Sequence, residues 1–319
     1  MLISKKYDKK TKPVRNTKKG LKMFKESMPL TLLVLPALVV TFIFRYIPLY
    51  GLLIPFKNFN VSLGIIGSPW AGLENFKFLI QSGSMFTALR NTILYNLVFI
   101  AVTPVFTIAI ALMLFELSRT RVKIYQTAML IPHFMSWVVV TYILNALLDM
   151  DSGILNQLRA VLGKEPILWY SEPSYWPFIL VAAHIWQTAG YSAVVYYAAL
   201  MGIDSSYFEA AKIDGATRFQ QVIYISLPTI KPIFIMLTIL NIGKIFYGDF
   251  GMFYNLPLNS PILLETTDVI DTYVYRSLIS LGDIGMSSAT GFCQSIFGFI
   301  LVIITNFITK KIDSDNALF

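Results

Sequence analysis

The two histidines and the single cysteine are the residues most suited to metal binding or catalysis, but their spacing supports neither. His133 and His184 lie far apart in different apolar stretches, and Cys293 lies in a third. No HExxH or CxxC spacing occurs near them, and no serine–histidine, cysteine–histidine or paired-carboxylate arrangement lies within an apolar stretch. The chain also lacks a GxxxxGK[ST] phosphate-binding loop. We therefore expect no catalytic residues, no metal site and no cofactor bound by this chain itself.

A group of aromatic and polar side chains between Trp176 and Leu200 could bind a solute instead. Trp186 and Gln187 are each four or five positions from Tyr191, so a helix would bring them near one face. Polar groups inside a membrane are costly and usually face a cavity or the helix bundle. We therefore predict a solute pathway here. The alternative is that Trp186 and Tyr191 pack or face lipid, while Gln187 forms an interhelical hydrogen bond.

Asn241, Lys244 and Tyr247 form a second candidate group, near the end of a later apolar stretch. Their three-residue spacing places them on one face of a helix. A buried ammonium is costly unless it is paired. Lys244 is therefore expected either to meet an acid such as Asp249 or to face a wet pathway, and we favour the pathway.

The elements that position these groups are predicted to be membrane-spanning helices. Apolar residues make up 55% of the chain and charged residues only 14%, against about 25% in soluble domains. A span needs about 20 mainly apolar residues. Six stretches qualify: Pro29 to Phe56, Ala88 to Leu117, Ile124 to Leu148, Trp176 to Leu200, Thr229 to Tyr247 and Met286 to Ile308. We expect an all-α membrane protein with one six-helix transmembrane domain over residues 29–308.

The distribution of charge predicts the orientation of the chain. Ten lysine and arginine residues precede Pro29, and Arg119, Arg121 and Lys123 follow the second predicted span. By the positive-inside rule these segments are cytoplasmic, while the acidic segment between the last two spans lies outside. Both tails, residues 1–28 and 309–319, are therefore expected in the cytoplasm. The basic tail could also bind anionic membrane lipids or a partner, but basic residues do not form the stripe that a nucleic-acid binder needs.

The segment from Asp204 to Pro228 predicts two short helices on the cytoplasmic side. Ser206 and Glu209 have the spacing of a capping box, Asp214-Gly215 supplies a turn, and Thr217 with Gln220 could cap a second helix running to Leu227. Pro228 suits the first turn of the fifth span. The first short helix is apolar nearly all round, so it must be buried against something. A groove on a cytoplasmic partner would bury it. Its apolar residues are Tyr207, Phe208, Ala210, Ala211 and Ile213.

This segment resembles the EAA loop of ABC-importer permeases. The run Glu209-Ala210-Ala211, then Asp214-Gly215-Ala216, then Ile225-x-Leu227-Pro228 carries the resemblance. In that family the loop docks into a cleft of the ATPase and transmits its motion. The resemblance therefore implies that the residues coupling this chain to an ATPase are Tyr207, Glu209, Ala210, Ala211, Asp214 and Gly215.

Further motifs resemble the first permease of importers for complex carbohydrates, the alginate-type and related oligosaccharide systems. They include Tyr46-Ile-Pro-Leu-Tyr-Gly51, Ser68-Pro-Trp-Ala-Gly-Leu-Glu-Asn-Phe76, Ile131-Pro-His-Phe-Met-Ser-Trp137 and Asp268-Val-Ile-Asp-Thr-Tyr-Val-Tyr-Arg276. The resemblance implies a type I importer fold in a bacterial cytoplasmic membrane. It also implies a second, non-identical permease, two ATPase subunits that bind ATP and Mg, an external sugar-binding protein and an oligosaccharide substrate. The segment from Gly248 to Pro261 departs from this family's pattern.

Two other classes of function fit the sequence less well. An ion-coupled transporter or channel would need intramembrane carboxylates, and the predicted spans hold almost none away from their ends. An intramembrane enzyme would need a positioned acid, base or metal. The long outer segments 57–87 and 149–175 are better explained as a scaffold for an outside partner. Ser287, Gly291 and Ser295, spaced by four residues, indicate a close interface with another span or with the partner permease.

Overall fold

The computed structural model describes Met28 and residues 31–312. The predicted basic tail therefore lies outside the described residues except for Met28, and the predicted C-terminal tail is described only to Ile312. The chain divides into two compact units, Met1–Leu53 and Ile54–Phe319.

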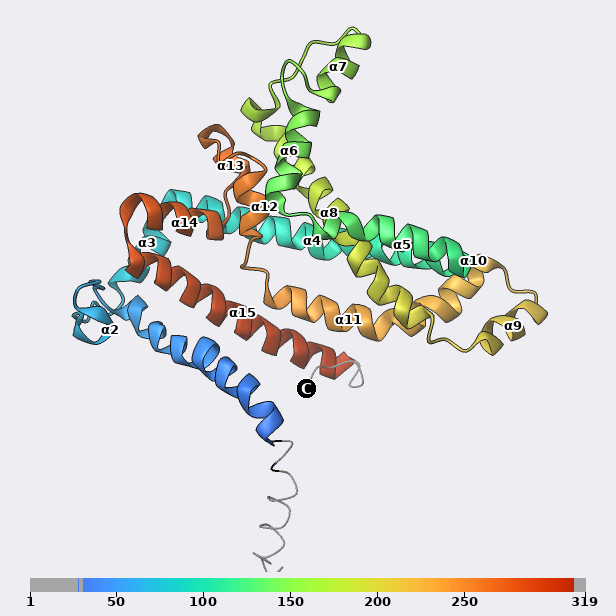
Figure 1. The fold of residues 1–319 in the computed structure, drawn as a ribbon, viewed down its shortest axis with the longest axis horizontal. Helices are drawn as coiled ribbons and strands as arrows, with labels where there is room; N and C mark the ends of the chain where they lie inside the picture. Colours follow the sequence, from blue (N-terminus) through green and yellow to red (C-terminus); the bar gives the residue numbers. More distant parts are fainter. Residues whose placement is uncertain (1–27, 29–30, 313–319) are drawn as a thin grey trace, which may run out of the picture. The chain divides into compact units, whose positions relative to one another are not determined.

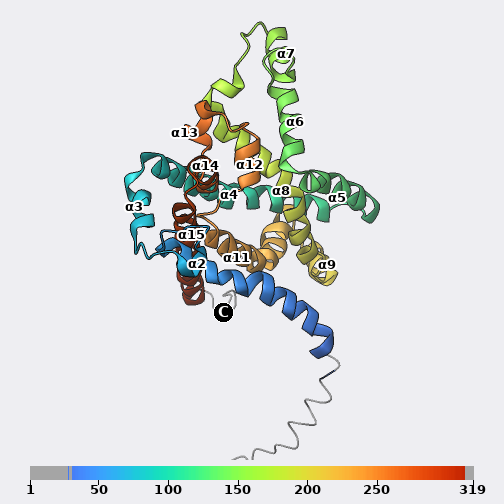
Figure 2. The same cartoon turned by 60° about the vertical axis from the view of Figure 1, so that its left-hand side comes forward.

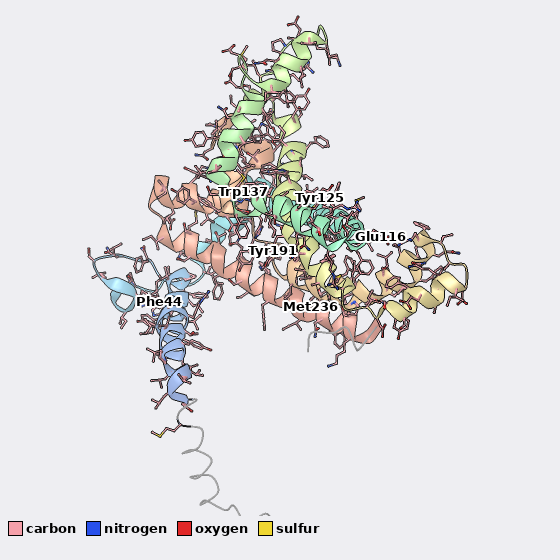
Figure 3. All side chains as sticks on the ribbon, turned by 45° about the vertical axis from the view of Figure 1, so that its right-hand side comes forward. Phe44, Glu116, Tyr125, Trp137, Tyr191 and Met236 are labelled. Carbon is pink, nitrogen blue, oxygen red and sulfur yellow. The ribbon has the colours of Figure 1, made fainter. Side chains whose placement is uncertain are left out.

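A single continuous helix makes up the described part of the first unit apart from Met28, and it continues to Phe56. It runs over Thr31–Phe56, with a π-helical turn at Phe42–Tyr46 and a 3-10 segment at Ile47–Phe56. Figure 3 labels Phe44 within the π-helical turn. The helix is 26 residues long and strongly apolar, which is enough to cross a membrane. This matches the first predicted span from its third residue onward.

Four helices of the second unit are also long and apolar enough to span a membrane. The described residues thus contain five such helices, or six if one bent pair counts as a single span. The four are α4 (Gly83–Phe115), α8 (Trp176–Leu200), α15 (Ile284–Ile312) and a continuous run made of α10 (Arg218–Gln221), η5 (Val222–Ser226) and α11 (Leu227–Gly243). The prediction of an all-α membrane fold is confirmed.

The third predicted span is not one straight helix. It consists of α5 (Arg119–Phe134) and α6 (Trp137–Leu148), which meet at an angle of 98°. Pro132 lies in the last turn of α5, the backbone of Met135 and Ser136 is extended, and the Ser136 side chain caps α6 by accepting from the Val139 N–H. Proline near the end of one helix, followed by a capping serine, ends that helix and begins the next. Figure 1 shows α6 leaving the line of α5.

Glycines allow the long helices to approach one another closely. A Cβ atom on Gly190 of α8 would lie 2.1 Å from the backbone oxygen of Met129 in α5. Where α11 packs on α15, a Cβ on Gly298 would lie 2.5 Å from the Gly243 oxygen. Gly291, predicted to lie in a close interface, has open space at its Cβ position. Within the described residues of this chain, the close approach on α15 is at Gly298, two turns further along, and a contact of Gly291 with another subunit stays a prediction.

The outer segments fold into short helices that pack on the spans. Figures 1 and 2 both place α12 and α13 near α6 and α8. Their shared core is built from Trp176, Leu180, Met252, Leu256, Leu263 and Val269. Backbone oxygens of this segment are bound by α4, because Asn91 donates to Glu265 and Asp268 at 3.0 and 2.9 Å. The outer helices are α2 (Gly64–Gly67), α3 (Glu74–Gln81), α7 (Ile154–Val161), η3 (Trp169–Ser171), η4 (Pro173–Tyr175), α12 (Phe250–Asn255), η6 (Pro261–Leu263), α13 (Leu264–Thr267) and α14 (Ile270–Leu281).

Lys57 organises the loop that follows the first helix. Its ammonium donates to the backbone oxygens of Ile65, Ile66 and Ser68 at 2.7, 3.0 and 3.1 Å, and it lies 5.1 Å from the centre of the Trp70 ring. The residue is 5% exposed. A buried cation is thus balanced by three carbonyl dipoles and an aromatic face in place of a carboxylate.

Candidate functional site

A cavity of about 440 Å³ lies where α4 and α8 meet the end of α11 and the turn that follows it. The predicted residues Asn241, Lys244 and Tyr247 all line this cavity, together with Asp249. Its other lining residues are Asn96, Phe99, Ile100, Thr103, His184, Thr188, Ser192, Gly248 and Phe253. The cavity therefore combines amides, hydroxyls, rings and one group of each charge.

Lys244 lies at the point where the fifth span unwinds. The α11 helix ends at Gly243 and Lys244 is its C-cap, so the predicted continuation of this span to Tyr247 is wrong. Across residues 31–312, the Lys244 side chain has neither a hydrogen bond nor an ion pair, so the predicted alternative of pairing with Asp249 is not observed. The Asp249 carboxylate instead accepts from the Trp137 indole at 2.7 Å and from the Met252 N–H at 3.1 Å. The ammonium at the cavity wall is thus available to a ligand.

Side chains from two other helices, α4 and α15, stabilise the unwound turn after α11. Asn96 of α4 donates to the backbone oxygens of Ile245 and Tyr247 at 3.1 and 2.9 Å. Gln294 of α15 donates to the Phe246 oxygen at 2.7 Å, and the Tyr247 hydroxyl lies 2.9 Å from that of Ser295. Irregular backbone at membrane depth is tolerated where its polar groups are satisfied in this way. Sequence reasoning missed Asn96 and Gln294, although amides inside apolar stretches were a detectable signal.

Asp271 is the acidic group that completes this turn. Its carboxylate accepts from the Gly248 N–H at 2.6 Å. Burial raises the pKa of Asp271, against the lowering effect of that hydrogen bond. Burial likewise raises the pKa of Asp268, which is opposed by Thr272 and by an ion pair with Arg276. Both carboxylates bind parts of the outer segment to each other.

The predicted group on α8 does not line this cavity. Trp186 is 45% exposed and lies in an apolar groove with Val102, Phe178 and Ile185. A neighbouring face of α8 lines the cavity instead. It carries His184, Thr188 and Ser192, which are spaced by four residues. The His184 ring stacks on Phe99 with ring centres 3.8 Å apart.

Gln187 and Tyr191 lie instead at the bend between α5 and α6. The Gln187 amide donates to the backbone oxygen of Met135 at 3.0 Å. The Tyr191 ring stacks on His133 at 4.3 Å with an interplanar angle of 9°. Figure 3 labels Tyr191 together with Trp137, which begins α6. The interhelical hydrogen bond considered for Gln187 is therefore present, and it satisfies a carbonyl that the bend leaves free.

The loop between the fourth and fifth spans has the predicted helix, turn, helix form. The first helix is α9 (Ser205–Ile213), Gly215 has a φ of +79°, and Thr217 and Gln220 form a capping box. The cap of α9 is Asp204, whose carboxylate accepts from the Ser206 N–H at 2.9 Å, so the predicted Ser206–Glu209 capping box is wrong. Hydrogen bonds from Ser206 lower the pKa of Asp204.

The second helix of this loop does not end before the fifth span. It passes through the π-helical turn η5 into α11, so no break separates Leu227 from Pro228. Pro228 lies in the first turn of α11, as predicted. One continuous helix therefore joins the loop to Gly243, directly before Lys244.

One face of the loop packs against the end of α4, and another face exposes apolar side chains to solvent. The Phe208 ring packs on Phe115 at the end of α4, with centres 5.5 Å apart, and Arg218 forms an ion pair with Glu116 at 2.5 Å. Figure 3 labels Glu116 at this end of the unit. In contrast, Tyr207, Ile213 and Phe219 are 64%, 86% and 72% exposed. Of the predicted coupling residues, Glu209, Ala210, Asp214 and Gly215 are exposed and Ala211 is half-buried.

Comparison with known proteins gives a consistent set of relatives. The family described as binding-protein-dependent transport system inner membrane component matches residues 82–314. A polygalacturonan/rhamnogalacturonan transport system permease protein of Bacillus subtilis, YteP, is 36% identical over 88% of each chain. The trehalose/maltose transport system permease protein MalF of Thermococcus litoralis is 26% identical over 88% of this chain and 92% of its own.

Solved structures resemble the chain along nearly its whole length. A chain from a bacterial ABC transporter that imports the acidic polysaccharide alginate has a TM-score of 0.84 and 29% sequence identity, covering 92% of this chain and 99% of its own. A second structure, of a bacterial alginate ABC transporter in complex with an alginate pentasaccharide-bound periplasmic protein, has a TM-score of 0.82 at 29% identity, covering 91% and 97%.

Proposed function

The chain belongs to the family of binding-protein-dependent transport system inner membrane components, and we propose that its substrate is an acidic oligosaccharide. It is a membrane-spanning permease subunit of an ATP-driven sugar importer in the inner membrane. It is not itself an enzyme, because ATP hydrolysis belongs to separate subunits of such importers. It works with a second permease, ATPase subunits and an external sugar-binding protein.

The observation that supports an acidic substrate is the free ammonium of Lys244 at the wall of the cavity. Asp249 lines the same cavity, but its carboxylate already accepts two N–H groups. An anionic sugar would therefore find one unsatisfied cation and a carboxylate whose charge is partly neutralised. Asn241 and Tyr247 beside Lys244 add an amide and an aromatic ring, which suit sugar hydroxyls and ring faces. Of the proteins compared above, one is a polygalacturonan/rhamnogalacturonan permease and another belongs to a transporter of the acidic polysaccharide alginate.

Energy enters this chain through the loop from Asp204 to Pro228. The bare residues Tyr207, Ile213 and Phe219 would be buried in a cleft of the ATPase, and Glu209 and Asp214 offer charges at its rim. ATP and Mg would bind only to the ATPase subunits. A change in ATPase conformation can move the loop only if the two states grip it differently. The continuous helix from Arg218 to Gly243 would then carry the movement to the cavity.

The direct test is sugar-stimulated ATPase activity of the reconstituted importer. Both permeases, the ATPase and the binding protein are placed in proteoliposomes, and trigalacturonate is compared with maltotriose. We expect trigalacturonate to stimulate hydrolysis and uptake, and Lys244→Gln to reduce that stimulation by about tenfold or more, because a charge-assisted hydrogen bond is lost. Lys244→Arg should retain most of it. Equal stimulation by the neutral trisaccharide would refute an acidic substrate.

A further inference from the structure

A second hollow, of about 340 Å³, lies between α6 and the segment 254–259, which ends α12 and continues into the turn after it. Thr141, Tyr142 and Asn145 of α6 line one side, and Tyr254, Asn255 and Asn259 line the other. The described side chains that line it carry no charge, unlike the cavity that holds Lys244. The hollow is therefore suited to the uncharged hydroxyl groups of a ligand.

Among residues 31–312, the three asparagines of the hollow keep unused hydrogen-bonding groups. Asn255 donates its amide to the Gly251 oxygen at 2.7 Å, which leaves its side-chain oxygen free. Asn259 accepts from Arg276 at 3.5 Å, which leaves its amide N–H groups free. In the part of the chain that the structure describes, the Asn145 side chain has no hydrogen bond at all. Donors and acceptors are thus both available, as the hydroxyl groups of a sugar require.

The backbone that carries Asn259 is held in an unusual conformation. Leu258 and Asn259 have φ values of 55° and 48°, in the left-handed region that residues other than glycine seldom adopt. The Asn259 N–H donates to the Tyr254 oxygen at 3.2 Å, and Arg276, which contacts Asn259, is ion-paired with Asp268. Such conformations persist where the surroundings enforce them, and they cluster at ligand sites. Here they direct an amide toward the hollow.

An aromatic ring in a fixed position completes the wall. Tyr254 stacks on Phe250 with ring centres 5.1 Å apart and meets the edge of Tyr275 at 5.3 Å. Tyr142, on the facing helix, is 73% exposed. Two phenol rings flanking a set of amides provide a ring face and polar groups for one pyranose.

We propose that this hollow is a second carbohydrate subsite, which binds the neutral hydroxyl groups of one sugar unit while an acidic unit of the same oligosaccharide reaches Lys244. The proposal rests on the proposed function. The two hollows share α12, because Phe253 lines the cavity and Tyr254 lines the second hollow. Asn145 lies eight residues along α6 from Trp137, which binds Asp249 of the cavity, and this corresponds to about 12 Å of helix. A single sugar ring cannot cover both sites, so the second one would favour longer chains.

The test compares long with short acidic oligosaccharides in the complete importer. Asn145→Ala and Asn259→Gly are made singly and together. Glycine tolerates the left-handed backbone at 259, so that variant keeps the test valid even if Asn145→Ala disturbs α6. Val139→Ala, on the same helix but outside the lining, is the matched control. Uptake of pentagalacturonate and digalacturonate is measured in competition in proteoliposomes.

We expect the preference for pentagalacturonate over digalacturonate to fall by about fivefold in each single variant, the loss from one hydrogen bond, and by more in the double variant. Uptake of digalacturonate should be unchanged in every variant. The Val139→Ala control should keep the wild-type preference for pentagalacturonate. An unaltered preference in the double variant would overturn the subsite. So would loss of the second permease or the binding protein from the purified complex, because the hollow would then be a protein contact. If the wild-type importer transported neither oligogalacturonide, the proposed function would fail first.

Discussion

At the scale of single residues, the packing of α8 on α5 depends on the missing side chain of Gly190. We expect Gly190→Ala to destabilise the protein by about 1–3 kcal/mol, because its Cβ would overlap the Met129 backbone, which cannot rotate away. The measurement is the thermal unfolding midpoint of the purified complex in detergent. Gly291→Ala is the control, since it adds the same atom to a spanning helix at a point where no described residue lies within 4 Å. Equal midpoints for the two variants would contradict the close packing.

Lys57 permits a second test of one side chain. Lys57→Met should loosen the loop from Asn58 to Trp70, because three backbone oxygens lose their donor at a cost of about 1–3 kcal/mol or more. Hydrogen exchange of that loop is the measurement, and its protection should fall. Lys77→Met is the matched control, because the pair of Lys77 with Glu74 is exposed and contributes little. Unchanged protection in Lys57→Met would show that other contacts hold the loop.

At the scale of elements, the turn at Gly215 places the strictest limit on which residue can occupy its position. Its φ of +79° excludes β-branched residues, although a Cβ atom itself would meet nothing within 4 Å. We expect Gly215→Val to lower sugar-stimulated ATPase and uptake by tenfold or more while the complex still folds, because the α9 helix would be reoriented. Gly215→Asn should restore most of the coupling, since asparagine tolerates this conformation. Normal coupling in Gly215→Val would remove the loop from the mechanism.

The elements also show which parts of the fold can be read from sequence. Hydropathy located the long helices because lipid requires a minimum apolar length, and Gly215 and Thr217 marked the loop by local chemistry. The bend after Phe134 was missed because a hydropathy average reports how apolar a stretch is and not whether its helix is straight. The stretch over α5 and α6 is apolar whether or not the two helices are collinear. It depends on a capping serine and on Gln187, 52 positions from Met135. Lys244 was found, but the unwinding that exposes it depends on Asn96 and Gln294, from distant helices.

At the scale of the whole molecule, the predicted orientation can be tested with the chain's single cysteine removed. In a Cys293→Ser background, Asp214→Cys should react with an impermeant maleimide only from the cytoplasmic face. Ser152→Cys, on the outer segment before α7, should react only from the outside. Both positions are exposed, so differences in labelling of intact cells and inverted vesicles report topology alone. Labelling of both from the same face would contradict the single crossing by α8 that separates them, and with it the predicted sidedness.

The bare face of α9 has a consequence for how cells handle this chain. A copy made without its ATPase would present Tyr207, Ile213 and Phe219 to the cytoplasm, and exposed apolar residues of this kind are aggregation-prone and are bound by chaperones and proteases. Unassembled copies should therefore be short-lived. The abundance of the permease would then follow the supply of its ATPase rather than its own rate of synthesis. Permease copies without an ATPase would be degraded.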